Sequence, residues 1–165
     1  MNEAHDHLLF NHLPIIIPFV GFLIMIGGIL IRSEIVKRTA YCVFILGAIL
    51  TMPAFFSGEG AEEVVENLPG IGHAIIHEHE EIAEIFAALS YMLGALAILG
   101  LWANWKQKTF SKVLTFITLG FCLAVFFLAQ KTGSSGGEIR HTEIRSGQPV
   151  SSDAEASGEK EKAEQ

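Results

Sequence analysis

Four long apolar runs are the feature that most limits the fold of this chain. The first, 13–31, is nineteen residues long without a charged side chain, and nearly uncharged runs follow at about 39–56, 82–105 and 110–129. A helix of about 18 or more apolar residues can cross the roughly 30 Å hydrocarbon core of a membrane. The sequence therefore predicts an all-α fold, an up-down bundle of four transmembrane helices. A soluble bundle would need far more polar surface than these runs carry.

The segments around the apolar runs predict the domain organisation. Residues 1–145 are expected to form one membrane domain, and 146–165, rich in Ser, Glu and Lys, a disordered tail. The acidic connection 57–72 carries apolar side chains at helical spacing, which predicts a short amphipathic helix at the membrane surface, ended by Pro69-Gly70. The first twelve residues contain no Lys or Arg, so no cleaved signal peptide is expected and 13–31 stays as a membrane helix.

The third helix is predicted to begin near Ile71 and to continue to Trp105. At about 1.5 Å per residue it is roughly 50 Å long, longer than the hydrocarbon core is thick. Its first three turns, HAIIHEHEEIAE at 73–84, are therefore expected to project beyond the hydrocarbon. Ionisable side chains at such a boundary either mark a site or stay in the hydrated layer.

The connecting segments predict the orientation in the membrane. The connections 32–38 and 104–112 hold six Lys or Arg side chains and one acid, Glu34, whereas the connection 57–80 and the N-terminal segment hold no Lys or Arg. The positive-inside rule then places both termini and the acidic connection outside the cytoplasm. The formal net charge of −7 argues against nucleic-acid binding.

With this orientation, all seven histidines of the chain fall on the extracytoplasmic side. Neutral imidazole is the commonest metal ligand in proteins, so a one-sided group of histidines beside carboxylates indicates a metal or haem site. At about 100° per residue, His79 lies within an apolar arc of the third helix. The opposite face, which is expected to meet water, carries the secondary candidates for metal ligands, His73, His77, Glu80 and Glu84. The inverse arrangement stays open, because the polar face of a membrane helix can also point into the bundle.

His12 and His79 are the first candidates for cofactor binding. His12 opens the first membrane helix, and the first and third helices of an up-down bundle run parallel, so both imidazoles are expected at one level. Two imidazoles from different helices are the axial ligands that a b-type haem needs. His141 is the third candidate, because the sequence GSSGG at 133–137 predicts a flexible turn that folds it back over the same end.

Structural readings of the histidines also stay open. His5 and His7, in the polar N-terminal segment, are expected to be solvated. His12 and His79 can equally be helix-end hydrogen bonders without a ligand. Cys42 and Cys122 lie inside predicted membrane helices and are expected to be small core residues, and no C-x-x-C-H sequence for covalent haem attachment is present.

The start of the first membrane helix, His12-Leu13-Pro14-Ile15, resembles the His-Phe-Pro-Ile start of a bacterial family of small four-helix inner-membrane proteins of unknown function. Further short matches, in the same order, are 62–70 (EEVVENLPG), 79–81 (HEE) and 136–138 (GGE) followed by His141. The resemblance covers roughly residues 8–145. It implies a bacterial inner-membrane location and a haem or redox-metal role, with His12, His79 and His141 favoured over the other histidines.

Three functions are consistent with these features. The first is a membrane protein that binds a b-type haem or a transition-metal ion for electron transfer or redox sensing. The second is a structural or assembly subunit of a larger membrane or respiratory complex, which docks through its acidic face without a cofactor. The third is cation transport, which would need a homo-oligomer because the spans carry almost no ionisable group past Glu84. The sequence contains no catalytic motif, so an enzyme is not expected.

Overall fold

The computed structural model describes residues 3–66, 71–141 and 144–145, and its regular elements are all helices. The helices follow one another along the chain with short connections. The elements, in chain order, are α1 (Glu3–Phe10), α2 (Leu13–Leu30), α3 (Glu34–Val65), α4 (His73–Trp105) and α5 (Ser111–Arg140).

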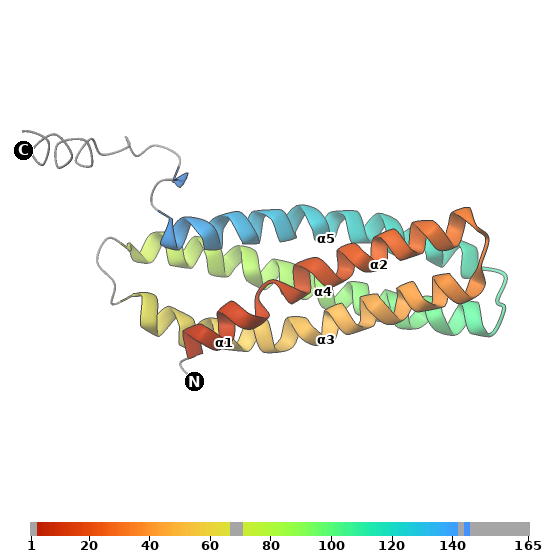
Figure 1. The fold of residues 1–165 in the computed structure, drawn as a ribbon, viewed down its shortest axis with the longest axis horizontal. Coiled ribbons are helices and arrows are strands. Elements are labelled where there is room, and N and C mark those ends of the chain that lie inside the picture. The colour runs from red at the N-terminus through yellow and green to blue at the C-terminus, as the bar shows by residue number, and fades with distance from the viewer. Residues whose placement is uncertain (1–2, 67–70, 142–143, 146–165) are drawn as a thin grey trace, which may run out of the picture.

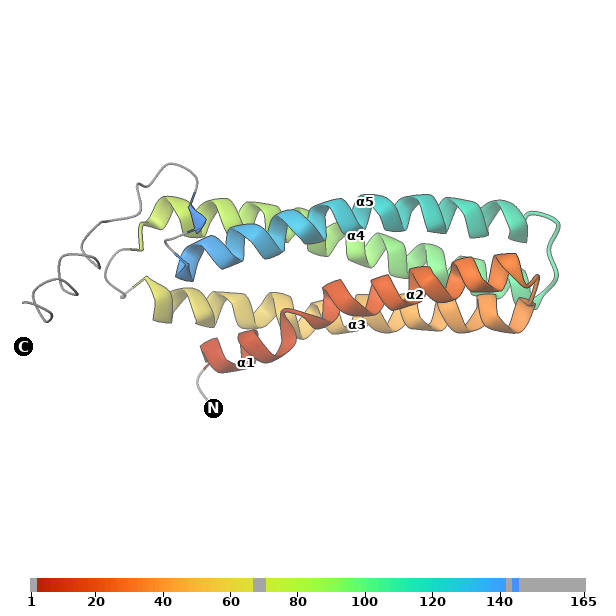
Figure 2. The same ribbon diagram turned by 45° about the horizontal axis from the view of Figure 1, so that its top comes forward.

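Four helical stretches are long and apolar enough to cross a membrane: α1 together with α2, and then α3, α4 and α5. Successive helices run in opposite directions and pack side by side, α2 on α3, α3 on α4 and α4 on α5 (Figures 1 and 2). The short helix α1 lies against α3 at one end of the bundle. The prediction of an all-α fold with four membrane-crossing helices is confirmed.

Two tight turns at the same end of the bundle reverse the chain. Arg32 after α2 and Gln107 after α4 both have a positive φ, of 54° and 51°. Each lets the next backbone N–H reach back five residues, Ser33 to the Gly28 carbonyl at 3.0 Å and Lys108 to the Ala103 carbonyl at 2.9 Å. This is the hydrogen bond that closes a helix with a left-handed residue, and it satisfies carbonyls that the helix end would otherwise leave unpaired.

Glycines allow the helices to pack at very short range. A Cβ at Gly100 of α4 would overlap the ring of Tyr41 on α3, and a Cβ at Gly94 would overlap Ala48. Tyr41 is fully buried, and its hydroxyl lies 3.0 Å from the Thr115 hydroxyl on α5. In lipid, where helix association depends on close van der Waals contact, small residues at the interfaces are the expected means of packing.

Three boundaries differ from the sequence prediction. Residues 57–65 continue α3 instead of forming a separate surface helix, because α1 packs along this part of α3 and Gly58 and Gly60 do not interrupt it. The N-terminal segment is helical as α1, and α5 runs through the glycines at 133–137 to Arg140. Hydroxyl bonds within α5, from Thr132 to the Leu128 carbonyl and from Ser135 to the Thr132 carbonyl, accompany this extension.

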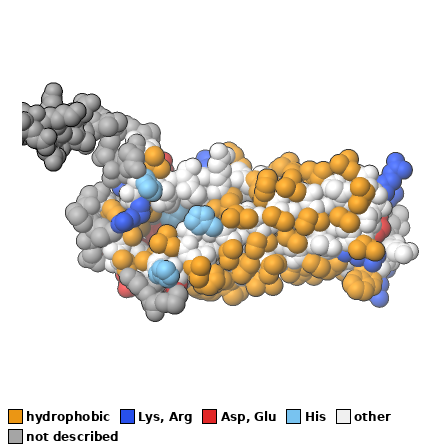
Figure 3. All heavy atoms as spheres, viewed as in Figure 1, with side chains coloured by type: hydrophobic (Ala, Val, Ile, Leu, Met, Phe, Trp, Pro, Cys, Tyr) orange, Lys and Arg blue, Asp and Glu red, His pale blue; other side chains and the backbone are white. Residues whose placement is uncertain are grey.

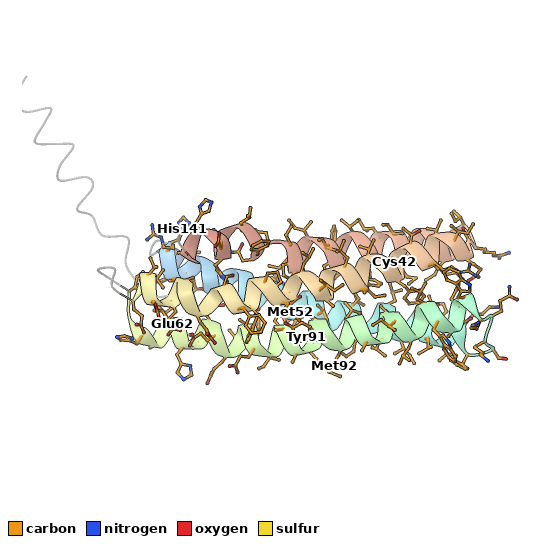
Figure 4. The ribbon with its side chains drawn as sticks, turned by 90° about the horizontal axis from the view of Figure 1, so that it is seen from below. Cys42, Met52, Glu62, Tyr91, Met92 and His141 are labelled. Carbon is orange, nitrogen blue, oxygen red and sulfur yellow. The ribbon has the colours of Figure 1, made fainter. Side chains whose placement is uncertain are left out.

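Smaller differences concern helix starts and one cysteine. α3 begins at Glu34 instead of about 39, with the Ser33 hydroxyl accepting from the Val36 N–H at 3.4 Å, and α4 begins at His73. Cys122 is buried as predicted, but Cys42 is exposed on the outside of α3 (Figure 4), so its predicted core position is wrong. Pro69-Gly70, the predicted end of the surface helix, and the predicted disordered tail 146–165 lie outside the described residues.

The two ends of the bundle differ in charged side chains. We call the end with the two tight turns the lysine end, and the end with α1, the last turns of α3 and α5 and the start of α4 the histidine end. Figure 3 shows Lys and Arg gathered mainly at the first and the visible histidines at the second, with a hydrophobic band between them. The lysine end carries Arg32, Lys37, Arg38, Lys106, Lys108 and Lys112.

Candidate functional site at the histidine end

His79 of α4 is held by side chains and backbone of α5. Its Nδ1 lies 2.9 Å from the Ser135 hydroxyl, and it also makes a hydrogen bond with the Thr132 backbone. The Ser135 hydroxyl donates its proton to the Thr132 carbonyl at 3.1 Å, so its oxygen is left to accept from His79. With Ser135 donating to Thr132, we assign Nδ1 of His79 as the donor in the bond to Ser135.

A glycine makes the space that the His79 ring fills. A Cβ at Gly136 would lie 2.9 Å from Cε1 of His79 and 3.4 Å from Nδ1. Real side chains do not pack this closely, so any larger residue at this position would displace the ring or the helix. The ring is half-buried, and its contacts with α5 fix its orientation.

His7 of α1 is seated on α3 in a closely similar way. Its Nδ1 lies 3.1 Å from the Ala54 carbonyl and 3.2 Å from the Ser57 hydroxyl, which itself donates to the Ala54 carbonyl at 3.1 Å. A carbonyl oxygen only accepts, so Nδ1 is the donor and Nε2 carries the free lone pair. Gly58 follows Ser57, and a Cβ there would lie 3.8 Å from Cε1 of His7.

The hydrogen-bonding surroundings of His7 and His79 share one local pattern. In each, a serine hydroxyl bonds the carbonyl three residues earlier in its own helix, a glycine follows the serine, and a histidine from another helix places Nδ1 on the serine. His7 and His79 lie close enough for their charges to interact. We call these two histidines, with Ser57 and Ser135, the paired-histidine site.

His7 was expected to be solvated, and this expectation is wrong. It is half-buried, because α1 folds back onto α3 instead of extending into water. The sequence signal that could have indicated it is the repeated Ser-Gly pair, at 57–58 and 135–136, near the ends of two membrane helices. Nothing in the spacing of the histidines themselves points to it.

His12 lies at the expected level but faces away from the bundle. It precedes α2, whose Ile15 side chain would lie 3.9 Å from a Cβ at Gly133 of α5. Gly133 is one helical turn before Gly136, on which the His79 ring packs. The first and third membrane helices thus bring positions 12 and 79 to one end of the bundle. The His12 side chain is exposed, however, whereas the His79 ring points toward α5.

His141 also lies at the histidine end, beyond the last turn of α5 (Figure 4). Its backbone N–H donates to the Gly137 carbonyl at 2.9 Å, and its side chain is exposed. The predicted flexible turn at 133–137 does not form, so this segment does not fold His141 back over the bundle. Instead, Arg145 caps the end of the helix by donating to the Glu138 and Ile139 carbonyls at 2.8 and 3.0 Å.

The secondary candidates lie along the outer face of α4 and pair with glutamates. His73 Nδ1 lies 3.2 Å from the carboxylate of Glu66, the residue that follows α3, and His77 Nε2 lies 3.9 Å from the Glu81 carboxylate. Both histidines are strongly exposed.

The two glutamates among the secondary candidates differ in their surroundings. The Glu80 carboxyl group lies beside that of Glu62 on α3, within hydrogen-bonding reach. Glu84 is exposed. Within the described ranges, no three or more His, Cys, Asp or Glu side chains gather to hold a metal ion.

Comparison with known proteins finds no family model, no curated protein and no solved structure that matches this chain. The likeness of the His12-Leu13-Pro14-Ile15 start to the family of small four-helix inner-membrane proteins therefore stays a prediction.

Proposed function

We propose that this protein is a multi-pass membrane protein that holds an iron of haem, or a transition-metal ion, at the histidine end through Nε2 of His79 and His7. One observation carries the proposal. Both rings place Nδ1 on a serine hydroxyl, and that of His7 also lies on the Ala54 carbonyl, so in the tautomers assigned from these partners Nε2 of each ring is the atom available to a metal. A metal-ligating histidine almost always donates its other ring N–H in this manner.

The number of protein ligands favours haem over a bare ion. A porphyrin supplies four nitrogens itself and needs at most two axial ligands from the protein, whereas a structural zinc site takes four protein ligands and a catalytic one takes three. The described residues offer two imidazoles at the histidine end that interact electrostatically, and no group of three or more His, Cys, Asp or Glu side chains that could hold an ion. The haem iron would supply one-electron chemistry, and the protein would fix the rings and limit water access through burial.

The remaining parts of the proposal concern location and partners. The basic connections at the lysine end support an orientation with both termini outside the cytoplasm. The site would then face the extracytoplasmic side of a bacterial inner membrane, where electron transfer to another membrane or respiratory subunit, or redox sensing, is the role we infer. His12 and His141, at the same end, are candidates for replacing His7 as the second ligand if α1 moves.

A second candidate function rests on the acidic character of the same end. The turns of α3 and α4 beyond the hydrophobic band carry Glu59, Glu62, Glu63, Glu66, Glu78, Glu80, Glu81 and Glu84. A face of this kind suits a subunit that docks onto a basic partner without holding a cofactor.

The deciding experiment is purification of the full chain in detergent, followed by an absorption spectrum and metal analysis. The haem proposal expects a Soret band that is lost in His79→Ala and strongly reduced in His7→Ala. His5→Ala is the matched control, since it removes an exposed imidazole of α1, two residues before His7, and should leave the band in place. Bound metal without a Soret band would favour a simple ion site. A colourless, metal-free protein would reject the cofactor and favour the docking subunit.

A further inference from the structure

A groove at the lysine end opens on the outside of α4. It is lined by the last turns of the helix, at Ile98, Leu101, Trp102, Trp105 and Lys106. The two tryptophans are 49% and 67% exposed, although both are large apolar side chains. Their position at the end of a membrane-crossing helix is where tryptophan is enriched, at the boundary between hydrocarbon and headgroups.

The aromatic walls of the groove are held in place by cations. The Lys108 ammonium lies 5.6 Å from the centre of the Trp102 ring, whose other neighbour is Phe110 at 6.5 Å between ring centres. The Arg38 guanidinium lies 5.5 Å from the Trp105 ring and donates to the Asn104 side-chain oxygen at 2.7 Å. A groove whose walls are already fixed loses little conformational freedom when it is filled.

Positive charge surrounds the mouth of the groove. Its acidic neighbour Glu34 is already paired, with Lys37 at 2.6 Å and with the side-chain amide of Asn104. Lys106 and Lys108 are both exposed and lie at the polar end of the groove. Apolar walls below exposed ammonium groups match the two parts of a phospholipid, a hydrocarbon chain and a phosphate.

We propose that this groove binds an anionic phospholipid, with an acyl chain along Ile98, Leu101 and the two tryptophans and the headgroup phosphate at Lys106 and Lys108. We choose an anionic lipid over a zwitterionic one because each Lys or Arg near the headgroup attracts a net negative charge, which a zwitterionic headgroup lacks. The proposal is independent of any cofactor at the histidine end.

Tryptophan fluorescence tests the proposal directly, because Trp102 and Trp105 are the two tryptophans of the chain and both line the groove. The full chain is reconstituted in vesicles that contain phosphatidylcholine and phosphatidylglycerol in one fixed ratio. In one preparation a small fraction of the phosphatidylglycerol carries brominated acyl chains, and in the other the same fraction of phosphatidylcholine does. Bromine quenches tryptophan on contact, so we expect stronger quenching by the brominated phosphatidylglycerol.

Charge variants then locate the preference. Each of Lys106→Gln and Lys108→Gln should weaken the preference for phosphatidylglycerol about fivefold. The tryptophans of the double variant should be quenched equally by both brominated lipids. Lys131→Gln is the matched control, because Lys131 is also exposed and lies 5.1 Å from the ring of Phe127, but near the opposite end of the bundle. Equal quenching by the two lipids in the unaltered protein would overturn the proposal. Loss of the preference in Lys131→Gln would also overturn it, since general surface charge would then be the cause.

Discussion

The imidazole of His79 on α4 and the hydroxyl of Ser135 on α5 form a 2.9 Å hydrogen bond between two residues that are 56 positions apart in sequence. A second histidine, His7 of α1, uses the same ring nitrogen on Ser57 of α3. Two helices that do not follow one another in the chain thus present their histidines in one tautomer at one end of the bundle. This repetition is why we place the functional site there.

Replacing Ser135 should weaken both the fold and cofactor binding. Ser135→Ala removes the acceptor for His79 Nδ1, which leaves a half-buried N–H with poorer bonding, and we expect a loss of about 1 kcal/mol in the free energy of unfolding. Because such supporting bonds orient a ligand, the affinity for added haem should fall roughly 10- to 100-fold. Unfolding in mixed micelles and a haem titration measure the two effects. Ser134→Ala, at an exposed neighbouring position, should change neither.

Enlarging Gly136 should displace the His79 ring. The added Cβ of Gly136→Ala would stand 2.9 Å from Cε1, and overpacking of this kind costs about 1–3 kcal/mol. Thermal unfolding of the purified protein in detergent should show a lower midpoint. Gly120→Ala lies in the same helix with open space around the new methyl group, and it should leave the midpoint unchanged or raise it. Equal midpoints for the two variants would contradict the close packing of the His79 ring against Gly136.

Gly100 should be equally intolerant at the other end of the bundle. A methyl group there would overlap the buried Tyr41 ring, so Gly100→Ala should reduce the free energy of unfolding by about 1–3 kcal/mol. It should leave any haem absorption per folded molecule unchanged, because the histidine end is not involved. Gly27→Ala in α2, where the new methyl group meets nothing within 4 Å, is the control. A stable Gly100→Ala protein would show that α3 and α4 can separate more easily than their packing indicates.

Asn104 should be important for stability at the lysine end. It is buried, accepts from Arg38 at 2.7 Å and donates to Glu34, so it joins the start of α3 to the end of α4. Asn104→Leu keeps the branched shape of the side chain but leaves both charged partners short of a hydrogen bond, and we expect a loss of about 1–3 kcal/mol. Chemical unfolding in micelles measures it against Lys112→Gln, an exposed charge change at the same end. Unchanged stability would mean that water replaces the amide without cost.

Much of the fold could be predicted from the sequence. The lengths of the apolar runs predict helices that can cross a membrane, and the short connections between them predict antiparallel neighbours, so the four-helix arrangement follows. The ends of the helices were less predictable. The sequence predicted that the second membrane helix ends at about 56 and that 133–137 form a flexible turn, but α3 and α5 continue through both segments, where neighbouring helices pack.

The candidate site was only half predicted. The apolar arc around His79 correctly indicated that this ring points among the other helices, and it does so toward Ser135. The proposed partners His12 and His141 are exposed, while His7, expected in water, is seated on α3. Helical periodicity gives the direction of a side chain on its own helix, but it says nothing of what an adjacent helix offers to it.

The sequence by itself determined that this chain is a set of apolar helices with its histidines at one end and most of its lysines at the other. Those properties belong to single segments, through their hydrophobicity and charge. Only the tertiary structure decided which histidines form a hydrogen bond with a serine of another helix. That choice depends on Ser-Gly pairs in α3 and α5, and their distance from His7 and His79 is set by helix packing instead of by spacing along the chain.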